Sequence, residues 1–427
     1  MAQPRAIVIG GGHNGLIASI KLAEAGFKVT LIEARGKVGG MLDTVEVAGG
    51  RVSRLAYVIG LMPREFLEKY KIPVIRQDPF QVIKVGNRVI PFWRDRERRI
   101  RELLKAGEVK FPEFEDKLFK FKELIYRRFT FTDNPPSLSE VREEAVKAGV
   151  EEFIDETCSK LLSEYLSEDL HYAFMYPGME NSPAYLIAYY YTTDWSFVRG
   201  GMGSVADALA KYARGVGVDI RLNAKARSII VSGDEVKGVE TDAGLLEADV
   251  VLAAVSPATL DELLGGRLRY PKPPRPGWRK YNIVLRDYPK MPEELKPYAH
   301  SILDTEAGEL VIPSILDDTR GRPVFEFMGS LELLMEEFQG LRDNVLAIDV
   351  ADPSVAEREY NVPNGDVNHI PMRMPYLFNG RPGYRTGIRG LYLGSAGSYP
   401  GGQVTGIPGF NAALAVAKDY GRSLSFP

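Results

Sequence analysis

Cysteine is nearly absent from this sequence, which holds one cysteine and four histidines among 427 residues. A single thiol, Cys158, excludes a disulfide framework, a cysteine-based metal cluster and a redox-active cysteine pair. We interpret Cys158 as a buried helix residue, and we predict no metal site.

Long apolar stretches are missing as well. No run of about 18 uncharged apolar residues occurs, which argues against a membrane-spanning helix. The first expected strand begins too early to leave room for a signal peptide. A formal net charge of −3 provides no general affinity for nucleic acid. We therefore expect a cytoplasmic protein that does not bind nucleic acid.

Glycine is abundant, and its first cluster lies between a strand and a helix. The apolar strand Ala6–Ile9 leads into a turn with Gly10, Gly12 and Gly15, and after the helix a second apolar strand ends at Glu33. Gly10 permits a sharp turn, Gly12 lets the backbone approach a pyrophosphate, and Gly15 lets the helix pack closely on the strand. This order predicts a dinucleotide-binding βαβ unit. The other residues of the predicted turn are His13 and Asn14.

Glu33 also predicts which dinucleotide binds. Its carboxylate can accept ribose hydroxyls and repels a 2′-phosphate, which disfavours NADP. Six residues later comes the doublet Gly39–Gly40, inside the segment Glu33–Met41. NAD-linked dehydrogenases do not need such an extension, whereas FAD enzymes run this glycine-rich segment along their longer cofactor. The sequence therefore favours FAD. The residues predicted to bind its nucleotide half, beyond the turn, are Glu33, Ala34, Arg35, Gly39, Gly40 and Met41.

The densest glycine block lies near the C-terminus, between Gly394 and Asn411. It follows the short strand Leu391–Leu393 and precedes a helix that ends near Tyr420, so it repeats the strand, loop and helix order of the N-terminus. We therefore expect both ends to embrace one cofactor in a discontinuous domain. The predicted cofactor domain covers 1–70, 199–270 and 380–427, and the predicted substrate or cap domain covers 71–198 and 271–379.

The two inserted segments differ in their expected structure. We expect the first to be largely helical, with helices between Glu140 and Leu166, and the second to contain strands. Between them we expect a helix from Val205 to Arg214, the strand Val218–Leu222 and a three-stranded meander. The predicted strands of the meander are 226–231, 236–241 and 246–255, and those of the second insertion are 281–285, 309–312, 324–327 and 345–350.

One segment, 84–130, is basic and aromatic. It holds 14 Lys and Arg against 8 Asp and Glu, which gives +6. One interpretation is a helical region with a solvated basic face; the other is a surface that docks peripherally on anionic lipid, with its aromatic side chains in the headgroup layer. Its aromatic residues are Phe92, Trp93, Phe111, Phe114, Phe119, Phe121, Tyr126 and Phe129.

Together these motifs resemble the FAD-dependent phytoene desaturase-like oxidoreductases. The resemblance rests on GGGHNGL, E-x(5)-GG, GGMG, A-x-A-x-x-I and GSAGSYPGGQVTGIPGFNAA, and it extends from end to end of the chain. The segment Ser53–Leu61 is most similar to the branch that contains pyridine nucleotide-disulfide oxidoreductase domain-containing protein 2. The resemblance implies an α/β fold, with a glutathione-reductase-like, Rossmann-type FAD domain, an inserted mixed α+β substrate domain and a helical subdomain.

The resemblance also implies roles for further residues. Ala226 would contact the adenine through its backbone, although relatives often have valine there. Tyr399 and Gln403 depart from the histidine and glycine that many relatives carry near the flavin, and we predict Tyr399, Arg54 and Tyr57 as catalytic candidates. The residues that would line the flavin are Gly394, Ser395, Gly401, Gly402, Val404 and Thr405.

Aromatic residues crowd the segment 172–197, which suits a flat isoprenoid-like or quinone-like substrate or an ordinary core. His171 and His369 are acid or base candidates, with structural roles as the alternative. We predict an FAD-dependent oxidoreductase that acts on C–C bonds of an apolar small molecule, with a quinone or oxygen as electron acceptor. The alternatives are a flavin-dependent amine oxidase and a flavoprotein with a non-catalytic interaction role.

Overall fold

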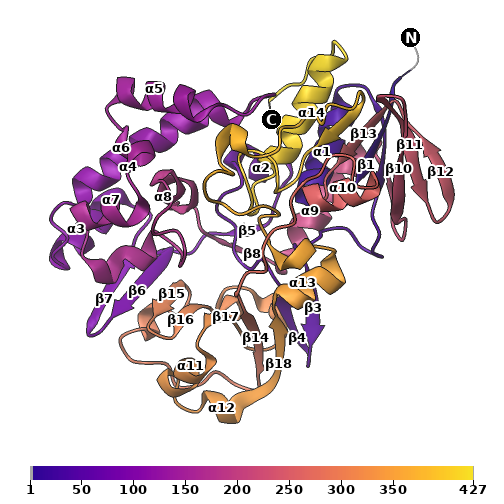
Figure 1. Ribbon diagram of the computed structural model, residues 1–427. Helices are drawn as coiled ribbons and strands as arrows, with labels where there is room; N and C mark the ends of the chain where they lie inside the picture. Colours follow the sequence, from indigo (N-terminus) through magenta and orange to yellow (C-terminus); the bar gives the residue numbers. More distant parts are fainter. Residues whose placement is uncertain (1–2, 427) are drawn as a thin grey trace.

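A parallel five-stranded sheet joins the two ends of the chain in the computed structural model, which describes residues 3–426 (Figure 1). Its strand order is β19-β13-β1-β2-β9, so β1 is central and every neighbouring pair is parallel. The strands are β1 (Arg5–Ile9), β2 (Lys28–Ile32), β9 (Asp219–Arg221), β13 (Val250–Ala253) and β19 (Leu391–Leu393).

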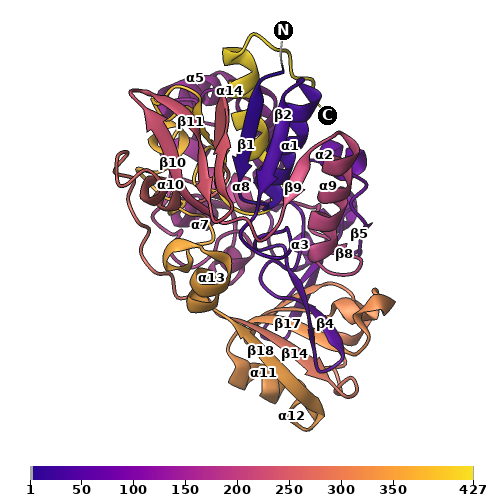
Figure 2. The same cartoon turned by 90° about the vertical axis from the view of Figure 1, so that its right-hand side faces the viewer.

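Both faces of this sheet are buried, as is usual for parallel strands. In β1, Ala6 and Val8 belong to the core under the helices, whereas Ile7 and Ile9 belong to the core under an antiparallel meander. Figure 2 shows α1 and α14 beside β1 and β2. The helices of this region are α1 (His13–Glu24), α2 (Arg64–Lys69), α9 (Gly203–Gly215), α10 (Pro257–Leu263) and α14 (Ile407–Asp419).

The meander differs from the expectation in its last strand. Its strands are β10 (Ala226–Ser232), β11 (Glu235–Thr241) and β12 (Gly244–Glu247). The predicted strand 246–255 is divided, because β12 ends at Glu247 and the all-apolar β13 leaves the meander to join the parallel sheet.

A mixed seven-stranded sheet forms the lower part of Figure 1, in the order β18-β14-β17-β16-β15-β6-β7. The strands β6 and β7 come from the first insertion, which we expected to be largely helical. A short turn at Gly86 and Asn87 joins them into a hairpin that pairs with β15. The strands are β6 (Gln81–Val85), β7 (Arg88–Phe92), β14 (Lys280–Leu285), β15 (Ile302–Thr305), β16 (Gly308–Val311), β17 (Val324–Gly329) and β18 (Val345–Ala351).

Small elements join this sheet to the rest of the molecule. The hairpin of β3 (Thr44–Val47) and β4 (Gly50–Ser53) packs against it, and the backbone N–H of Ser53 donates to Glu326 at 2.7 Å. A second short pair consists of β5 (Val74–Ile75) and β8 (Phe197–Val198). The helices beside the sheet are α11 (Leu331–Glu337), α12 (Leu341–Asn344) and α13 (Pro353–Tyr360).

The remaining helices form a separate region, drawn in purple at the left of Figure 1. A capping box of Ser137 and Glu140 begins α5, and Gly149, with a φ of 65°, ends it. These helices are α3 (Arg96–Lys105), α4 (Phe111–Ile125), α5 (Leu138–Ala148), α6 (Glu152–Asp155), α7 (Cys158–Tyr165) and α8 (Tyr185–Tyr190).

The structure divides the aromatic side chains of the segment 84–130 between the core and the surface, and its peripheral docking on lipid stays a prediction. Half of its aromatic side chains are core residues, and in the middle of the segment Arg99 is buried in an ion pair with Glu115. Side chains buried in the core cannot enter a headgroup layer, so the arrangement favours a helical region with a solvated basic face. The buried aromatic residues are Phe92, Phe111, Phe114 and Phe121. Among the described residues, no helix is long and apolar enough to span a membrane.

Candidate functional site

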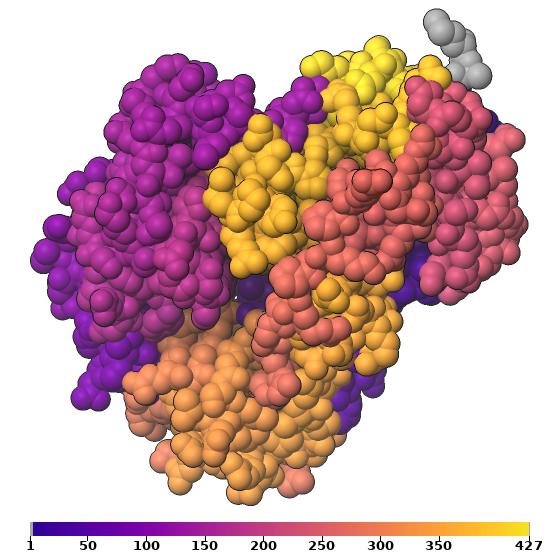
Figure 3. All heavy atoms as spheres, in the orientation of Figure 1, coloured from indigo at the N-terminus to yellow at the C-terminus, as the bar shows by residue number. Residues whose placement is uncertain are grey.

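A cavity of about 1640 Å³ lies where the region of the parallel sheet, the seven-stranded sheet and the helical region meet. In Figure 3 the surface is hollowed between the helical region, the C-terminal segment and the lower sheet, and indigo atoms of the N-terminal segment are visible inside. Pockets for a single small molecule measure about 300–1,000 Å³. This cavity therefore has room for a cofactor and a substrate together.

The glycine turn forms one end of the cavity. Gly12 is the N-cap of α1, which has no side-chain cap and no acidic residue in its first turn. A Cβ atom on Gly12 would contact nothing within 4 Å, whereas one on Gly15 would lie 1.9 Å from the carbonyl oxygen of Gly10. The free N–H groups at the start of α1 therefore face an open space beside Gly12, which suits a pyrophosphate.

His13 and Asn14 also line this end. Nε2 of His13 is buried without a hydrogen-bond partner among the described residues, and burial lowers the pKa of His13 to about 4. A neutral imidazole with an unpaired nitrogen can form a hydrogen bond with a polar ligand. The Asn14 carbonyl lies 2.0 Å from the position of a Cβ on Gly409, so α1 and α14 are in close contact.

Glu33 lines the cavity at the end of β2. Its Oε2 accepts a hydrogen bond from the Gly11 N–H and its Oε1 accepts one from the Arg35 N–H, both at 2.8 Å. Each carboxylate oxygen retains a lone pair, so the group can also accept ribose hydroxyls. The Ala224 N–H donates to the Glu33 carbonyl at 2.9 Å and brings Ala226 to the same wall.

The second predicted glycine segment returns to the first. The Gly39 N–H donates to the Gly11 carbonyl at 2.8 Å, and Gly39, Gly40 and Met41 line the cavity. Ala34 and Arg35 line it too, and Arg35 forms an ion pair with Asp43 at 2.7 Å. The structure thus brings the residues of the predicted nucleotide half together in the wall of the cavity, except Gly15, which packs α1 against the Gly10 carbonyl.

The C-terminal block reaches the cavity with fewer residues than expected. Val404 lines it together with Ala396 and Gln403, and Gln403 has a φ of 75°, a conformation that favours glycine. The other predicted residues lie behind this surface: a Cβ on Gly402 would be 2.1 Å from Oδ1 of Asn368. The predicted residues that lie behind it are Gly394, Ser395, Gly401, Gly402 and Thr405.

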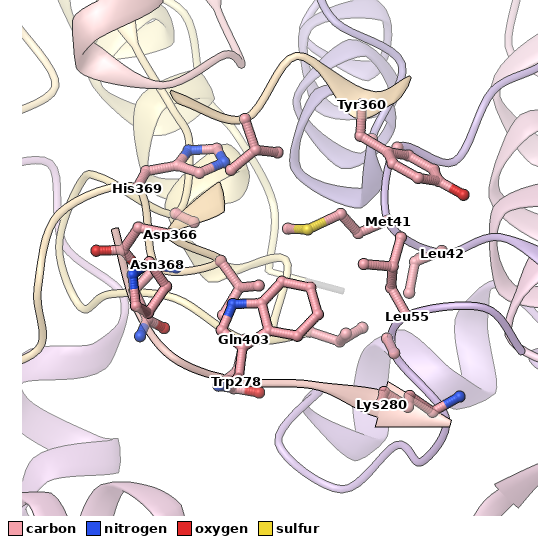
Figure 4. A pocket seen from close by; sticks show the side chains of 18 of the residues that line it. Met41, Leu42, Leu55, Trp278, Lys280, Tyr360, Asp366, Asn368, His369 and Gln403 are labelled. Carbon is pink, nitrogen blue, oxygen red and sulfur yellow. Dashed lines mark hydrogen bonds between the residues drawn. The ribbon is translucent and has the colours of Figure 1, made fainter. Parts of the chain in front are cut away.

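The segment 366–372 covers the C-terminal glycines, and His369 was its only predicted candidate residue. Figure 4 shows Asp366, Asn368 and His369 opposite Met41 and Tyr360, with Trp278 and Gln403 between them. His369 therefore lines the cavity, and burial and the neighbouring Arg381 lower its pKa to about 3. His171 does not line it, and its Nε2 lies 3.4 Å from the Leu166 carbonyl oxygen.

The three catalytic candidates have different surroundings. Tyr57 lines the cavity and donates a hydrogen bond to Glu309. Arg54 does not line the cavity and pairs with Asp349 and Glu359. Tyr399 is 0% exposed, does not line the cavity, and its hydroxyl has no partner among the described residues. The positions of Arg54 and Tyr399 favour structural roles.

The aromatic segment 172–197 supplies one wall of the cavity. Tyr189 lies outside this wall, and its hydroxyl donates to the Gly402 carbonyl at 2.7 Å, which connects α8 to the C-terminal block. Tyr185 and Phe197 are core residues that do not line the cavity. The aromatic residues in the wall are Tyr172, Phe174, Tyr176, Tyr190, Tyr191 and Trp195.

Three charged residues of the cavity that were not predicted lie on the seven-stranded sheet. Lys280 donates to the Ser53 carbonyl and to Asn282, and burial lowers the pKa of Lys280 to about 8. Asp304 and Glu309 lie on β15 and β16. No local motif surrounds them, and the strand pairing alone brings them into the cavity.

Comparisons with known proteins agree with this geometry. Residues 15–289 match the model of the flavin containing amine oxidoreductases. The chain is 24% identical to pyridine nucleotide-disulfide oxidoreductase domain-containing protein 2 of Mus musculus over 97% of this chain and 93% of that protein. It is 26% identical to the 1-hydroxycarotenoid 3,4-desaturase of a Flavobacterium species over 58% of this chain and 56% of the other.

A solved structure shows the same fold. The cyclohexylamine oxidase of Brevibacterium oxydans superposes with a TM-score of 0.61 at 17% identity, over 99% of this chain and 100% of that one. This likeness confirms the predicted α/β fold with a Rossmann-type domain and a substrate domain.

Proposed function

The chain belongs to the flavin containing amine oxidoreductase family, and we propose that it binds FAD and acts on C–C bonds of a small molecule with an apolar body. One observation carries this proposal: a single cavity joins the glycine turn of α1 to an aromatic wall. The relatives named above include a carotenoid desaturase, which agrees with the resemblance in the sequence.

The residues at the nucleotide end fit FAD. The free N–H groups at the start of α1 would bind the pyrophosphate, Glu33 would accept the ribose hydroxyls, and the backbone at Ala226 would contact the adenine. Gln403 and Val404 would border the flavin ring. Bound FAD supplies hydride acceptance and later passes the electrons onward.

The chain's own residues would position the substrate and exclude water. The aromatic wall offers flat apolar surfaces, such as those of Tyr190, Tyr191 and Trp195, that suit an isoprenoid-like or quinone-like body. His369, whose pKa lies near 3, is neutral at physiological pH and can accept or donate a hydrogen bond without adding charge. A quinone or oxygen would receive the electrons.

Anaerobic flavin reduction tests this function. We expect an isoprenoid or a quinol to change the oxidation state of the bound flavin, and NADH and NADPH to reduce it slowly. Mass spectrometry of a lipid extract of the purified protein would identify the apolar body. Rapid reduction by NADPH and no response to any apolar compound would contradict the proposal.

Amine oxidation is the second candidate, because the matching family model describes amine oxidoreductases and the cavity wall includes the carboxyl groups of Asp304 and Glu309. Rapid anaerobic reduction by a primary amine would favour it. A flavin that no isoprenoid, quinol, amine or nicotinamide reduces would indicate a non-catalytic flavoprotein.

A further inference from the structure

The outer strand β18 of the seven-stranded sheet has a free edge. Within residues 3–426 this strand pairs with β14 alone, and the backbone groups on its other edge form no hydrogen bond with another element (Figure 1). The strand is seven residues long. A free edge of this length offers a row of backbone donors and acceptors to another strand.

Apolar side chains project from β18 on the face that α11 and α12 cover elsewhere in the sheet. Leu346, Ile348 and Val350 alternate along the strand and are 38%, 36% and 38% exposed. Ile283, which lies directly opposite Ile348 on β14, is 0% exposed and belongs to the core under these helices. The helical cover therefore extends over β14 and ends before β18.

The other outer strands of the two large sheets have features that hinder pairing. At the opposite end of the same sheet, β7 carries Arg88 and Pro91, and a proline has no N–H to donate. In the parallel sheet, the outer strands β9 and β19 are three residues long. By contrast, β18 contains no lysine or proline, and its one charged residue, Asp349, pairs with Arg54 at 3.3 Å. A long apolar edge without these protections indicates a surface that another strand covers.

The order of residues in β18 fits a second copy of the same strand. In an antiparallel pair centred on Ile348, this residue lies opposite itself, and Leu346 of each copy lies opposite Val350 of the other. All the exposed apolar side chains of the strand then face apolar partners. On the other face Asp349 lies opposite Ala347, so the two carboxylates do not meet.

Exposed charges at the two ends of the strand complement each other in this arrangement. Asp343 precedes β18, and Arg279 lies beside its C-terminal end, because Lys280 pairs with Ala351. Both are exposed, and neither forms an ion pair within residues 3–426. Two-fold symmetry brings the start of one β18 to the end of the other, so Asp343 of each copy lies near Arg279 of the other. This complementarity favours a second copy over an unrelated strand.

We propose that two copies of this chain form a dimer in which their β18 strands pair antiparallel about a two-fold axis at Ile348. The two seven-stranded sheets would then form one continuous sheet, and no free apolar edge would remain. The proposal does not depend on the proposed function, because no residue of β18 lines the cavity.

Sedimentation velocity of the full chain over a range of concentrations tests this dimer. We expect the wild type to sediment with twice the 47.5 kDa mass of one chain. Ile348→Lys and Ile348→Glu should each raise the dimer dissociation constant at least about tenfold, because like charges would lie directly opposite each other at the axis. Leu245→Lys is the matched control and should leave the dimer intact, since Leu245 is a 50% exposed residue on β12 of another sheet.

An equal mixture of Ile348→Lys and Ile348→Glu tests the position of the axis. We expect the mixture to form a dimer that neither variant forms alone, because Lys and Glu would lie opposite each other. A mixture of Leu346→Lys with Val350→Glu tests the same register through another facing pair. Circular dichroism of each variant shows whether the fold is intact.

Three results would overturn the proposal. The first is a wild type that stays monomeric at the highest concentration measured. The second is a dimer that Ile348→Lys and Ile348→Glu both retain, and the third is folded variants that stay monomeric in both mixtures.

Discussion

At the scale of single residues, two glycines of the first turn have different roles, one in cofactor binding and one in packing. Gly12 faces open space, whereas Gly15 lies against the Gly10 carbonyl. We predict that Gly12→Val leaves the apoprotein folded but removes bound flavin, because the side chain would occupy the place of the pyrophosphate. Gly15→Ala should lower the free energy of unfolding by about 1–3 kcal/mol through overpacking. Flavin absorbance and urea unfolding measure the two effects, and a Gly12→Val protein with full flavin content would contradict the assignment.

Glu33 is expected to contribute to FAD binding through its carboxylate. We predict that Glu33→Ala weakens FAD binding by about 1.5–3 kcal/mol, because charge-assisted hydrogen bonds to the ribose are lost. Titration of the apoprotein with FAD measures the dissociation constant. Glu46→Ala, an exposed change in β3, is the control and should not alter it.

The raised pKa of Glu309 predicts a pH-dependent stability. The folded state holds a proton that the unfolded state releases as pH rises above the usual glutamate range, so the wild type loses stability in that interval. Glu309→Gln has no such proton. We predict that the melting temperature of Glu309→Gln, compared with that of the wild type, rises as the pH increases above the usual range of a glutamate. A difference that stays constant or shrinks would show that Glu309 ionises normally.

At the scale of elements, α3 and α4 are held together by a buried charge pair. Arg99 is 2% exposed, and its Nε lies 2.6 Å from Oε1 of Glu115. Removing one partner of a buried pair costs about 3–5 kcal/mol, so Arg99→Ala should lower the free energy of unfolding by that amount. Arg101, on the exposed side of α3, is the control, and Arg101→Ala should change stability by less than about 0.5 kcal/mol. Similar effects of both substitutions in urea unfolding would contradict the assignment of this helix face to the core.

Elements with local signals could be predicted from the sequence. The glycine turn, the strand that ends at Glu33 and the C-terminal block follow from turn chemistry and apolar runs that lie within a few residues of each other. The hairpin of β6 and β7 was missed, because its strands are short and Pro91 interrupts the second one. Asp304 and Glu309 were missed for a different reason: only the pairing of β15 with β16 brings them together, and nothing nearby in the sequence marks them.

Residues at the flavin end of the site were also difficult to predict from the local sequence. Tyr399 lies in the densest glycine block of the chain, yet its side chain is buried in the core. The segment 366–372, in which only His369 was a candidate, covers the glycines instead. A motif fixes the course of the backbone more reliably than it fixes which side chains face a cavity.

At the scale of the whole molecule, the parallel sheet draws its strands from both ends and the middle of the chain. The cavity then lies between this sheet, the seven-stranded sheet and the helical region. The domain boundaries given above stay a prediction. The β3–β4 hairpin belongs to the predicted cofactor domain but packs on the seven-stranded sheet, so limited proteolysis near this hairpin would test the boundary.

The central claim is that the two glycine-rich ends hold one non-covalent FAD. The one cysteine, Cys158, is buried in α7 and does not line the cavity, so it cannot tether a flavin. The most direct measurement is the flavin content of the purified protein, by its visible spectrum and by chromatography of the supernatant after denaturing precipitation. The account predicts a yellow protein that releases one FAD per chain. A colourless protein that FAD cannot reconstitute, or a flavin that stays with the precipitate, would contradict it.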